Sequence, residues 1–431
     1  MLWFGLASAA TWTVSEGESI QTVIEAAVDG DLIEVTPGSY PERLDFLGKD
    51  LVVRSTHGPE STVLDGEDVW DTSVVSFTSG EPITATLSGF TVTNGHGQPF
   101  VWEVGRGWVG AGVLIKDSAA TITDCLFLEN HSRHSGQSLG AGVAVVKSEV
   151  LLRDNTFRDN LGFWGGGGVG LIQATAHLEG NTFEGNLGTR GAGLIVLENS
   201  TAELSGNTFS DNHAGHGGHV YVKDSVLSSS GDTFQGGRAW RNGGAVVVLD
   251  AHATFAEAHF EDNHADHDGG HLWVAWSGGA TVMSSWMGSS SAQAGAVAFA
   301  RGAALTLEGV WLESPAADAV WAWQAAVQLF NVTASQPASP LIQAQDSGGA
   351  ALNVLVSGGE GPVVQGLDWS FGLAWDITDA PEGSIQADPL LEGGIPSPGS
   401  PAIDAGTPLW TDTDGSPSDI GATGGRTPWS P

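Results

Sequence analysis

Residues 140–160 read GAGVAVVKSEVLLRDNTFRDN, and this stretch holds both landmarks of the repeat that decides the fold. The first landmark is the motif Gly-(Gly/Ala)-x-(Val/Leu), and the second is a phenylalanine 14 residues after the end of that motif. Successive copies lie 25–30 residues apart, which is the spacing of a repeat architecture. The copies occupy residues 110–113, 140–143, 166–169, 191–194, 217–220, 243–246, 269–272 and, as the variant AGAV, 294–297.

An aromatic column keeps the same spacing, because each of its members follows its motif by 14 or 15 residues. An asparagine stands three residues after the aromatic residue in five of the copies. Two landmarks that share one spacing indicate a true internal repeat. The aromatic column consists of Phe127, Phe157, Phe183, Phe209, Phe234, Phe260, Trp286 and Trp311, and the asparagines are Asn130, Asn160, Asn186, Asn212 and Asn263.

Within each copy, apolar residues recur at every second position, which is typical of a strand with one buried face. A second short strand follows, as in residues 150–157. Parallel strands need a crossover, and about 25 residues per cycle without a helical pattern predict that the chain coils one turn per repeat. The predicted fold is all-β, a single-stranded right-handed parallel β-helix. The predicted inward pairs are Val113/Ile115, Val143/Val145, Val169/Leu171, Leu194/Val196, Val220/Val222, Val246/Val248, Leu272/Val274 and Val297/Phe299.

Several segments resemble known proteins of this kind. The GGxV and FxxN motifs resemble the repeats of polymorphic outer-membrane proteins, and the wider pattern resembles the pectin-lyase-like right-handed β-helix superfamily. SIQTVIEAAVDGDLIEVTPGSY at 19–40 is similar to the capping helix and first strand that open many such proteins. GSPAIDAG at 399–406 resembles the closing segment of secreted bacterial β-helix proteins. The resemblance implies this fold over nearly the whole chain and export from the cell.

The predicted organisation has five parts. Residues 1–10 are a remnant of a signal peptide or, alternatively, part of an apolar first strand. Residues 11–109 hold an N-terminal cap and the first turns, and 110–315 the regular repeats of about 26 residues. Residues 316–385 form less regular turns, and 386–431 form an irregular C-terminal cap that covers the open end of the coil.

The charge balance restricts the partners. The chain carries 50 acidic but only 15 basic residues, for a formal net charge of -35. A negative surface repels phosphate backbones and anionic lipid, so we expect neither nucleic acid nor a membrane surface as a partner. No stretch reaches the ~18 apolar residues of a membrane-spanning helix. The single cysteine, Cys125, is expected to be buried and inert.

Two near copies rich in histidine stand out, DNHAGHGGHVYV at 211–222 and DNHADHDGGHLWV at 262–274. If strict alternation extends back from Val220 and Leu272, the histidines just before them point outward, together with the next residue of each strand. Aromatic faces stack on sugar rings and contribute binding energy. The sequence thus predicts a ligand-binding surface made of His219, Tyr221, Trp240, His271 and Trp273.

Other interpretations of the same residues remain open. The histidines can be solvated turn residues made alike by duplication. A shared metal ion is disfavoured, because the two copies are about two rungs (~9.6 Å) apart and the turn between them carries Arg238 and Arg241. Those arginines would suit an anionic group such as a uronate carboxylate. β-Helix lyases use an arginine or lysine as base and the hydrolases use carboxylates, so the candidate catalytic residues are Arg238, Arg241, Asp266 and Asp268.

Near the C-terminus, Asp412, Asp414 and Asp419 surround Gly415 and partly resemble a calcium loop. The position of the first ligand is Trp410, which departs from that motif, so an ordinary Asp-rich turn is the alternative. No other cofactor is expected. The sequence favours a monomeric, secreted or cell-surface protein that serves as an adhesion or glycan-binding platform without catalysis. The alternatives are a lyase or glycoside hydrolase acting on an acidic polysaccharide, and a purely structural surface protein.

Overall fold

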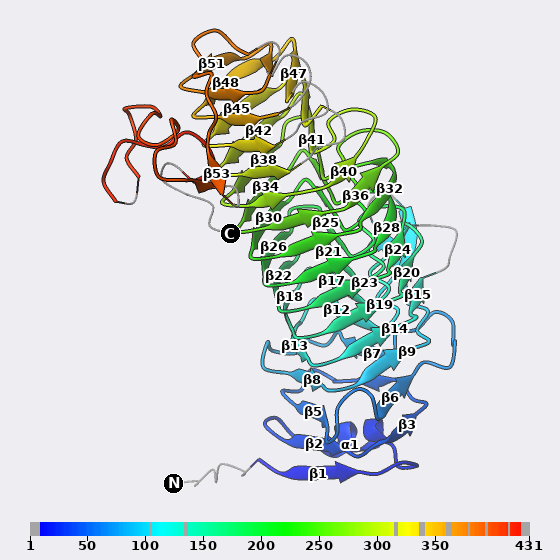
Figure 1. The fold of residues 1–431 in the computed structure, drawn as a ribbon. Helices are drawn as coiled ribbons and strands as arrows, with labels where there is room; N and C mark the ends of the chain where they lie inside the picture. Colours follow the sequence, from blue (N-terminus) through cyan, green and yellow to red (C-terminus); the bar gives the residue numbers. More distant parts are fainter. Residues whose placement is uncertain are drawn as a thin grey trace, which may run out of the picture. The chain divides into compact units, whose positions relative to one another are not determined.

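The computed structural model describes residues 9–102, 105–132, 137–313, 318–335, 341–358, 364–377, 380–392, 395–412 and 414–423. Contacts between residues divide the chain into two compact units, residues 1–202 and 203–431, and each unit is described by itself. Figure 1 shows the strands of each unit in successive turns of a coil. The predicted signal-peptide remnant falls mostly on residues 1–8, which lie outside the described residues.

The first unit begins with a strand and a short capping helix. Helix α1 (Ile20–Ala26) starts at Ser19, whose hydroxyl accepts a hydrogen bond from the backbone N–H of Thr22. The Glu42 carboxylate accepts a second one from the N–H of Ile20, at 2.7 Å. Ile20 and Ile24 are buried. The helix therefore covers the N-terminal turns with its apolar face, as the sequence of residues 19–40 predicts.

From β2 (Leu32–Val35) onward, each turn of the first unit contributes one strand to each of three parallel sheets, named A, B and C, and β1 (Thr11–Val14) adds one more strand to sheet A. Repeat-equivalent residues pair in register, as Val113 does with Val143. Sheet A contains β1 (Thr11–Val14), β2 (Leu32–Val35), β5 (Val52–Ser55), β8 (Thr86–Ser88), β13 (Ala119–Thr123), β18 (Glu149–Arg153) and β22 (Thr175–Glu179). Sheet B contains β3 (Gly38–Tyr40), β6 (Thr62–Asp65), β9 (Thr91–Thr93), β14 (Leu126–Leu128), β19 (Thr156–Arg158) and β23 (Thr182–Glu184). Sheet C contains β4 (Leu44–Asp45), β7 (Val75–Phe77), β12 (Val113–Lys116), β17 (Val143–Val146), β21 (Val169–Ile172) and β25 (Leu194–Leu197).

Two smaller sheets complete the first unit. A corner sheet lies between sheets B and C in chain order and contains β15 (His131–Ser132), β20 (Leu161–Gly162) and β24 (Leu187–Gly188). An antiparallel hairpin of β10 (Gln98–Trp102) and β11 (Gly105–Val109) is joined by β16 (Gln137–Leu139). Strand β26 (Thr201–Ser205) spans the boundary between the two units.

The second unit repeats the same cross-section. Its sheet A contains β30 (Val226–Ser230), β34 (His252–Ala256), β38 (Gly279–Met283), β42 (Ala304–Glu308), β45 (Ala326–Phe330), β48 (Gly348–Leu352) and β51 (Asp368–Ser370). Its sheet B contains β27 (Thr208–Ser210), β31 (Thr233–Gln235), β35 (His259–Glu261), β39 (Trp286–Met287), β43 (Trp311–Glu313), β46 (Thr333–Ser335), β49 (Leu355–Ser357) and β52 (Leu373–Trp375). Its sheet C contains β29 (Val220–Lys223), β33 (Val246–Leu249), β37 (Leu272–Ala275), β41 (Ala298–Arg301), β44 (Val320–Trp323), β47 (Ile342–Gln345) and β50 (Val364–Gln365). Its corner sheet contains β28 (His213–His216), β32 (Arg238–Asn242), β36 (Asn263–Ala265) and β40 (Ser290–Ser291).

The chain is therefore an all-β, right-handed parallel β-solenoid of about 12 turns, and the fold predicted from the repeat is confirmed. Among the described residues, no helix is long and apolar enough to cross a bilayer.

The phenylalanine column forms the core of both units, and its members are fully buried. In the second unit the rings of Phe209 and Phe234 stack at 5.1 Å, and those of Phe234 and Phe260 at 4.7 Å. The prediction that Trp286 and Trp311 continue this column is wrong, because Phe260 pairs with Met287, which pairs with Leu312. Trp286 instead stacks on His259 at 4.2 Å.

The last regular repeat also differs from the prediction. Leu272 pairs with Ala298 rather than with Val297, so Ala298 and Ala300 take the inward positions. Phe299 lies on the other face of the strand and stacks on Trp321 at 4.8 Å. The motif AGAV at 294–297 precedes its strand by one residue more than the earlier motifs do, and one residue of offset exchanges the two faces.

Two asparagine ladders bind successive turns together. In the predicted ladder, the Asn130 amide donates to Asn160 Oδ1 at 3.1 Å, and the Asn160 amide donates to Asn186 Oδ1 at 3.0 Å. A second ladder, two residues before the phenylalanine, was not predicted, although the recurring Asn-Thr-Phe signals it. Its members in the first unit are Cys125, Asn155 and Asn181, and those in the second unit are Asn207 and Asp232. Burial raises the pKa of the Cys125 thiol to about 12, as expected for an inert cysteine.

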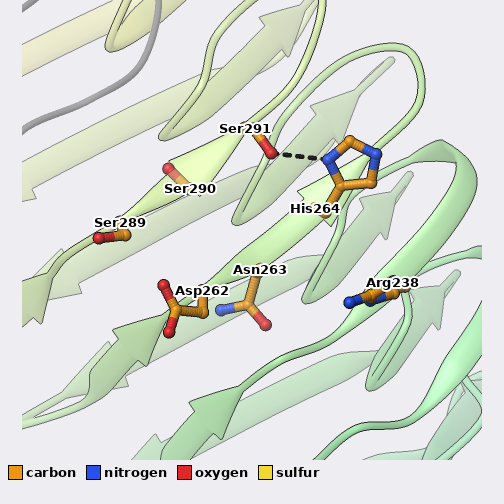
Figure 2. A pocket seen from close by; sticks show the side chains of 7 residues that line it. All are labelled: Arg238, Asp262, Asn263, His264, Ser289, Ser290 and Ser291. Atoms are coloured by element: carbon orange, nitrogen blue, oxygen red, sulfur yellow. Dashed lines mark hydrogen bonds between the residues drawn. The ribbon is translucent and has the colours of Figure 1, made fainter.

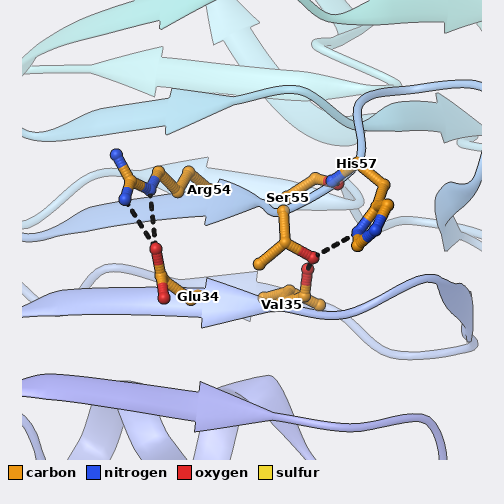
Figure 3. A network of polar contacts seen from close by, with 6 residues as sticks. Glu34, Val35, Arg54, Ser55 and His57 are labelled. Carbon is orange, nitrogen blue, oxygen red and sulfur yellow. Dashed lines mark hydrogen bonds and ion pairs between the residues drawn. The ribbon is translucent and has the colours of Figure 1, made fainter.

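Charged side chains on the outer faces of the first unit pair across neighbouring turns. Figure 3 shows Arg54 on β5 bonded to Glu34 on β2. Arg153 with Glu179 and Arg158 with Glu184 repeat the arrangement, each at 2.8 Å. Exposed pairs of this kind contribute at most about 1 kcal/mol each, but they neutralise several of the few basic residues.

The C-terminal segment packs against the last turns of the second unit. Ala402 and Ile420 form a buried apolar cluster with Leu355 and Leu373. The Asn353 side chain accepts from the backbone N–H of Thr407 at 2.7 Å and donates to the Ser418 hydroxyl at 3.1 Å. Strands β53 (Leu391–Glu392) and β54 (Ile395–Pro396) form a short antiparallel pair in this segment.

Candidate functional site

The two histidines that precede sheet C lie inside the coil. His219 and His271 are both 0% exposed, so the prediction that they point outward is wrong. Strand β29 begins at Val220 and β37 at Leu272, which makes each histidine a corner residue outside the strand. The alternation of a strand does not extend around such a corner.

The histidines join the asparagine ladder through a directed chain of hydrogen bonds. The Asn212 amide donates to His219 Nδ1 at 3.0 Å, and His219 Nε2 donates to Asn263 Oδ1 at 3.1 Å. The Asn263 amide then donates to His271 Nδ1 at 3.0 Å, and His271 Nε2 donates to the Gly288 carbonyl at 3.1 Å. Every step is satisfied by neutral rings that carry the proton on Nε2.

Burial lowers the pKa of His219 to about 3 and that of His271 to about 4. The charged form loses its hydration in the core, and the hydrogen bonds to Asn263 and Gly288 offset only part of this loss. Both rings therefore stay neutral at physiological pH and serve the packing of the coil.

The aromatic residues of the predicted surface separate in the structure. Tyr221 and Trp273 alternate with the inward Val220 and Leu272, so they face away from the interior of the coil. They are nevertheless only 5% and 8% exposed. Trp240, in contrast, is 54% exposed. Of the five predicted ligand-binding residues, Trp240 is the one whose side chain presents a large free surface.

The corner sheet of the second unit gathers another set of polar side chains. Its parallel register aligns His213 with Arg238, Arg238 with His264, and His264 with Ser291. Equivalent residues of adjacent strands lie ~4.8 Å apart, so these four side chains form a column on the outer face of four successive turns. The described residues provide no ion-pair partner for Arg238, which is exposed.

A bulge places Trp240 beside this column. The register between β28 and β32 shifts between Ala214 and His216, so that Trp240 and Arg241 together oppose Gly215. The Trp240 ring stacks on the imidazole of His213 at 5.8 Å with an interplanar angle of 25°. Burial lowers the pKa of His213, and the nearby Arg238 guanidinium lowers it further.

A depression of about 440 Å³ opens on the column (Figure 2). It is polar, and a serine in its wall, Ser290, is 6% exposed with a hydroxyl that has no hydrogen-bond partner. This residue takes the ladder position that an asparagine holds in earlier turns. The residues lining the depression are Arg238, Asp262, Asn263, His264, Ser289, Ser290 and Ser291.

His264 connects a hydroxyl to a carboxylate at this depression. Its Nδ1 lies 2.6 Å from the Ser291 hydroxyl, and its Nε2 lies 3.0 Å from Asp266 Oδ1. An ionised carboxylate only accepts, so Nε2 carries the proton and Nδ1 accepts from the serine hydroxyl. The result is a hydrogen-bonded Ser–His–Asp chain at the surface.

The other catalytic candidates lie apart from this chain. Arg241 is exposed on β32 and does not line the depression. Burial raises the pKa of Asp268, while the positive charges of His267 and Arg301 oppose that rise. The structure thus brings Arg238, Asp262 and Asp266 to the same region, together with His264 and Ser291, whose roles sequence reasoning missed. The available signal was the exchange of Gly215 in the first histidine-rich copy for Asp266 in the second.

The predicted calcium residues form turns within the C-terminal segment. Asp414 Oδ1 accepts from the backbone and the hydroxyl of Ser416, which lowers the pKa of the carboxyl. Asp412 accepts from the N–H of Asp419, whose own pKa is raised by burial. Among the described residues, which omit Thr413, no group of three or more His, Cys, Asp or Glu side chains is arranged to hold a metal ion.

Comparison with solved structures gives distant likenesses. A mannuronic-acid-specific family 6 polysaccharide lyase from the human gut microbiota is 12% identical, with 84% of this chain and 83% of that chain covered and a TM-score of 0.40. A surface adhesin of Streptococcus pneumoniae is 11% identical, with 85% and 87% covered and a TM-score of 0.40. The catalytic domain of a GH87 α-1,3-glucanase is 10% identical, with 84% and 66% covered and a TM-score of 0.37, so the chain spans about two thirds of that domain.

At these scores the likenesses assign no function to the chain. No curated protein sequence matches it. The family model described as the right-handed beta helix region matches twice, over residues 85–287 and 141–326. The two overlapping matches together cover more than half of the chain, and the chain therefore belongs to the right-handed β-helix family.

Proposed function

We propose that this protein is a secreted or cell-surface platform that binds a glycan on the corner sheet of its second unit. The observation that carries the proposal is the exposed Trp240 ring next to the unpaired Arg238 guanidinium, on the strand that borders the polar depression. A flat aromatic face stacks on the apolar face of a sugar ring. The serine hydroxyls of the depression supply hydrogen bonds to sugar hydroxyls.

Arg238 indicates what kind of sugar suits this surface. A guanidinium binds a carboxylate through two parallel hydrogen bonds, as in a uronate residue. With a net charge of -35, the protein as a whole repels a densely charged polyanion. The arrangement therefore favours a glycan that places an acidic sugar at Arg238 and neutral sugars around it.

Binding of a glycan without cleaving it is the simplest function of this surface, and a monomer of the protein suffices for it. Export is part of the proposal, supported by the signal-like start of the sequence and by its resemblance to secreted bacterial β-helix proteins.

A glycan array followed by calorimetric titration of the best hit tests the proposal. Trp240→Ala and Arg238→Ala should each weaken binding at least about tenfold, because each removes a main contact. Trp70→Ala is the matched control, since Trp70 is 58% exposed and also stacks on a histidine, His96, at 5.1 Å. No binding to any glycan, or equal losses in the control, would contradict the proposal and favour a purely structural surface protein.

A lyase or glycoside hydrolase acting on an acidic polysaccharide is the second candidate. It is favoured because Arg238 and His264 line the same depression and Asp266 is hydrogen-bonded to His264. Together the three side chains offer a cation, a base and an acid. Incubation with uronate polymers, followed by measurement of unsaturated and reducing ends, distinguishes cleavage from binding. Products that vanish in Arg238→Ala, but persist in Arg241→Ala, would establish an enzyme at this site.

A further inference from the structure

We propose that Ser291, His264 and Asp266 form a nucleophilic site that hydrolyses acyl esters. Ser291 is the nucleophile, His264 its general base, and Asp266 a residue that positions the imidazole. This activity goes beyond glycan binding and does not depend on it, because the alcohol part of an acyl ester need not be a sugar.

The coil itself brings the three side chains together. Ser291 is the in-register partner of His264 on the next turn, which places the two about one strand spacing apart. Asp266 follows His264 by two residues, in the bend just after β36, and its carboxylate lies within hydrogen-bond distance of the imidazole. The observed hydrogen bonds of 2.6 and 3.0 Å follow from this placement. They lie within the range of a working nucleophile–base–orienter chain.

The duplicated repeat provides an internal comparison. His213 holds the position of His264 one copy earlier, but Gly215 stands where Asp266 would be, and Arg238 stands where Ser291 would be. His213 stacks on Trp240 instead. The two copies share the sequence Asp-Asn-His-Ala. The carboxylate and the hydroxyl are thus features of the second copy alone, which argues that they do not merely follow from the repeat.

The surroundings of Ser291 can accommodate the carbonyl group of an ester. The depression in front of Ser291 is open to solvent and holds about 440 Å³, enough for a short acyl group on a larger molecule. The Arg238 guanidinium and the partnerless Ser290 hydroxyl line the same depression. Arg238 is the donor available to an oxyanion that forms there, because it is exposed and has no ion-pair partner among the described residues, whereas the Ser290 hydroxyl is buried at the ladder position.

The reaction balances without any further reagent than water. Ser291 Oγ attacks the carbonyl carbon and its proton passes to His264 Nδ1, while Asp266 holds Nε2–H and stabilises the imidazolium. The tetrahedral intermediate expels the alcohol, which takes the proton back from His264, and leaves an acyl-serine. Water, deprotonated by the same nitrogen, then hydrolyses the acyl-serine and releases the carboxylic acid.

Covalent labelling of the full chain with diisopropyl fluorophosphate tests the nucleophile directly. The serine oxygen displaces fluoride, and peptide mass spectrometry locates the modified residue. We expect the label on Ser291, loss of labelling in Ser291→Ala, and a fall of about 10²-fold or more in His264→Gln. His252→Gln is the control, because His252 is exposed at the start of β34, away from the depression. Equal labelling of the exposed neighbour Ser289, or a rate that His264→Gln leaves unchanged, would overturn the proposal.

Asp266→Asn tests the positioning residue. The maximal labelling rate should fall about tenfold or more, whereas the reagent concentration at half-maximal rate stays the same. A merely structural loss would change both quantities or the unfolding temperature. Unaltered maximal labelling in this variant would remove Asp266 from the site.

Turnover of p-nitrophenyl acetate completes the test. Surface imidazoles hydrolyse this ester slowly by themselves, so the relevant quantity is the part of the rate that Ser291→Ala abolishes. A serine-dependent rate with an acyl-serine burst supports the proposal, and a rate equal in the wild type and Ser291→Ala contradicts it. These assays contain no glycan, so their failure is distinct from a failure of the glycan-binding proposal.

Discussion

His219 fills the space that Gly237 leaves in the asparagine ladder. A Cβ atom on Gly237 would lie only 2.5 Å from His219 Nε2, and the histidine bridges Asn212 and Asn263 across the missing rung. The two positions are 18 residues apart, as are the glycine and asparagine of the pairs Gly112/Asn130, Gly142/Asn160 and Gly168/Asn186. A glycine at the corner thus accompanies an asparagine in the ladder, and a histidine at the corner accompanies a glycine in the ladder.

This complementarity predicts a compensating swap. Gly237→Asn should destabilise the protein by overpacking, at a cost of about 1–3 kcal/mol. His219→Gly should cost a similar amount, because it opens a cavity and leaves Asn212 and Asn263 without a bridge. The double variant restores the glycine/asparagine pattern of the first unit and should recover part of the loss. Denaturant unfolding of the four proteins measures the coupling, and strictly additive losses would contradict this account.

The neutral histidine chain predicts a loss of stability in mild acid. The pKa values of His219 (about 3) and His271 (about 4) are lowered in the folded state from the ordinary 6.5. The unfolded chain therefore binds more protons below pH 6.5. The contribution of the two neutral histidines to the free energy of unfolding is complete above pH 6.5. It falls as the pH drops toward 4, by up to about 1.4 kcal/mol per pH unit for each histidine.

Denaturant titrations between pH 7.5 and 5 measure this slope. His271→Gln should reduce it by up to half, and His252→Gln, which changes an exposed histidine, should leave it unchanged. An identical slope in the wild type and His271→Gln would mean that the buried ring is not the group responsible.

The sequence predicted the coil, because its two landmarks repeat in register and the pairing of Val113 with Val143 follows directly. It failed where local geometry departs from the average repeat. His219 belongs to a corner rather than to a strand, and a single-residue offset before Ala298 exchanged the faces. The Ser291–His264–Asp266 chain joins residues on two turns, so it becomes visible only when the register is known to the residue.

The register at the end of the phenylalanine column can be checked by a pair of substitutions. Phe234 is fully buried between Phe209 and Phe260, so Phe234→Ala should cost about 3–5 kcal/mol. Trp286, which the sequence places in the same column, packs outside on His259, and Trp286→Ala should cost clearly less. Chemical unfolding of both variants gives the two values. Equal losses of stability in the two variants would instead support the register predicted from the sequence, with Trp286 in the buried column.

Asp232 occupies a position that holds asparagine in the three preceding turns of the second ladder. Its carboxylate is 0% exposed and accepts from the Asn207 amide at 2.9 Å and from the Ser229 hydroxyl at 2.6 Å. Burial raises its pKa, and these hydrogen bonds offset only part of that effect. A raised carboxyl pKa means that the folded state holds its proton more tightly than the unfolded state does, so ionisation at neutral pH opposes folding.

Asp232→Asn should therefore stabilise the protein at pH 7.5, by about 1 kcal/mol, since an asparagine keeps the shape of the ladder and removes the buried charge. The gain should shrink as the pH falls, because the wild-type carboxyl then becomes protonated and loses the same charge. Asp224→Asn serves as the control, because Asp224 is exposed beside Lys223 at 3.1 Å and its replacement should change stability by less than about 0.5 kcal/mol. Thermal and denaturant unfolding of the wild type and the two variants at pH 7.5 and at pH 5 measures these differences. A loss of stability in Asp232→Asn at pH 7.5 would show that the buried carboxylate contributes more through its hydrogen bonds than burial costs.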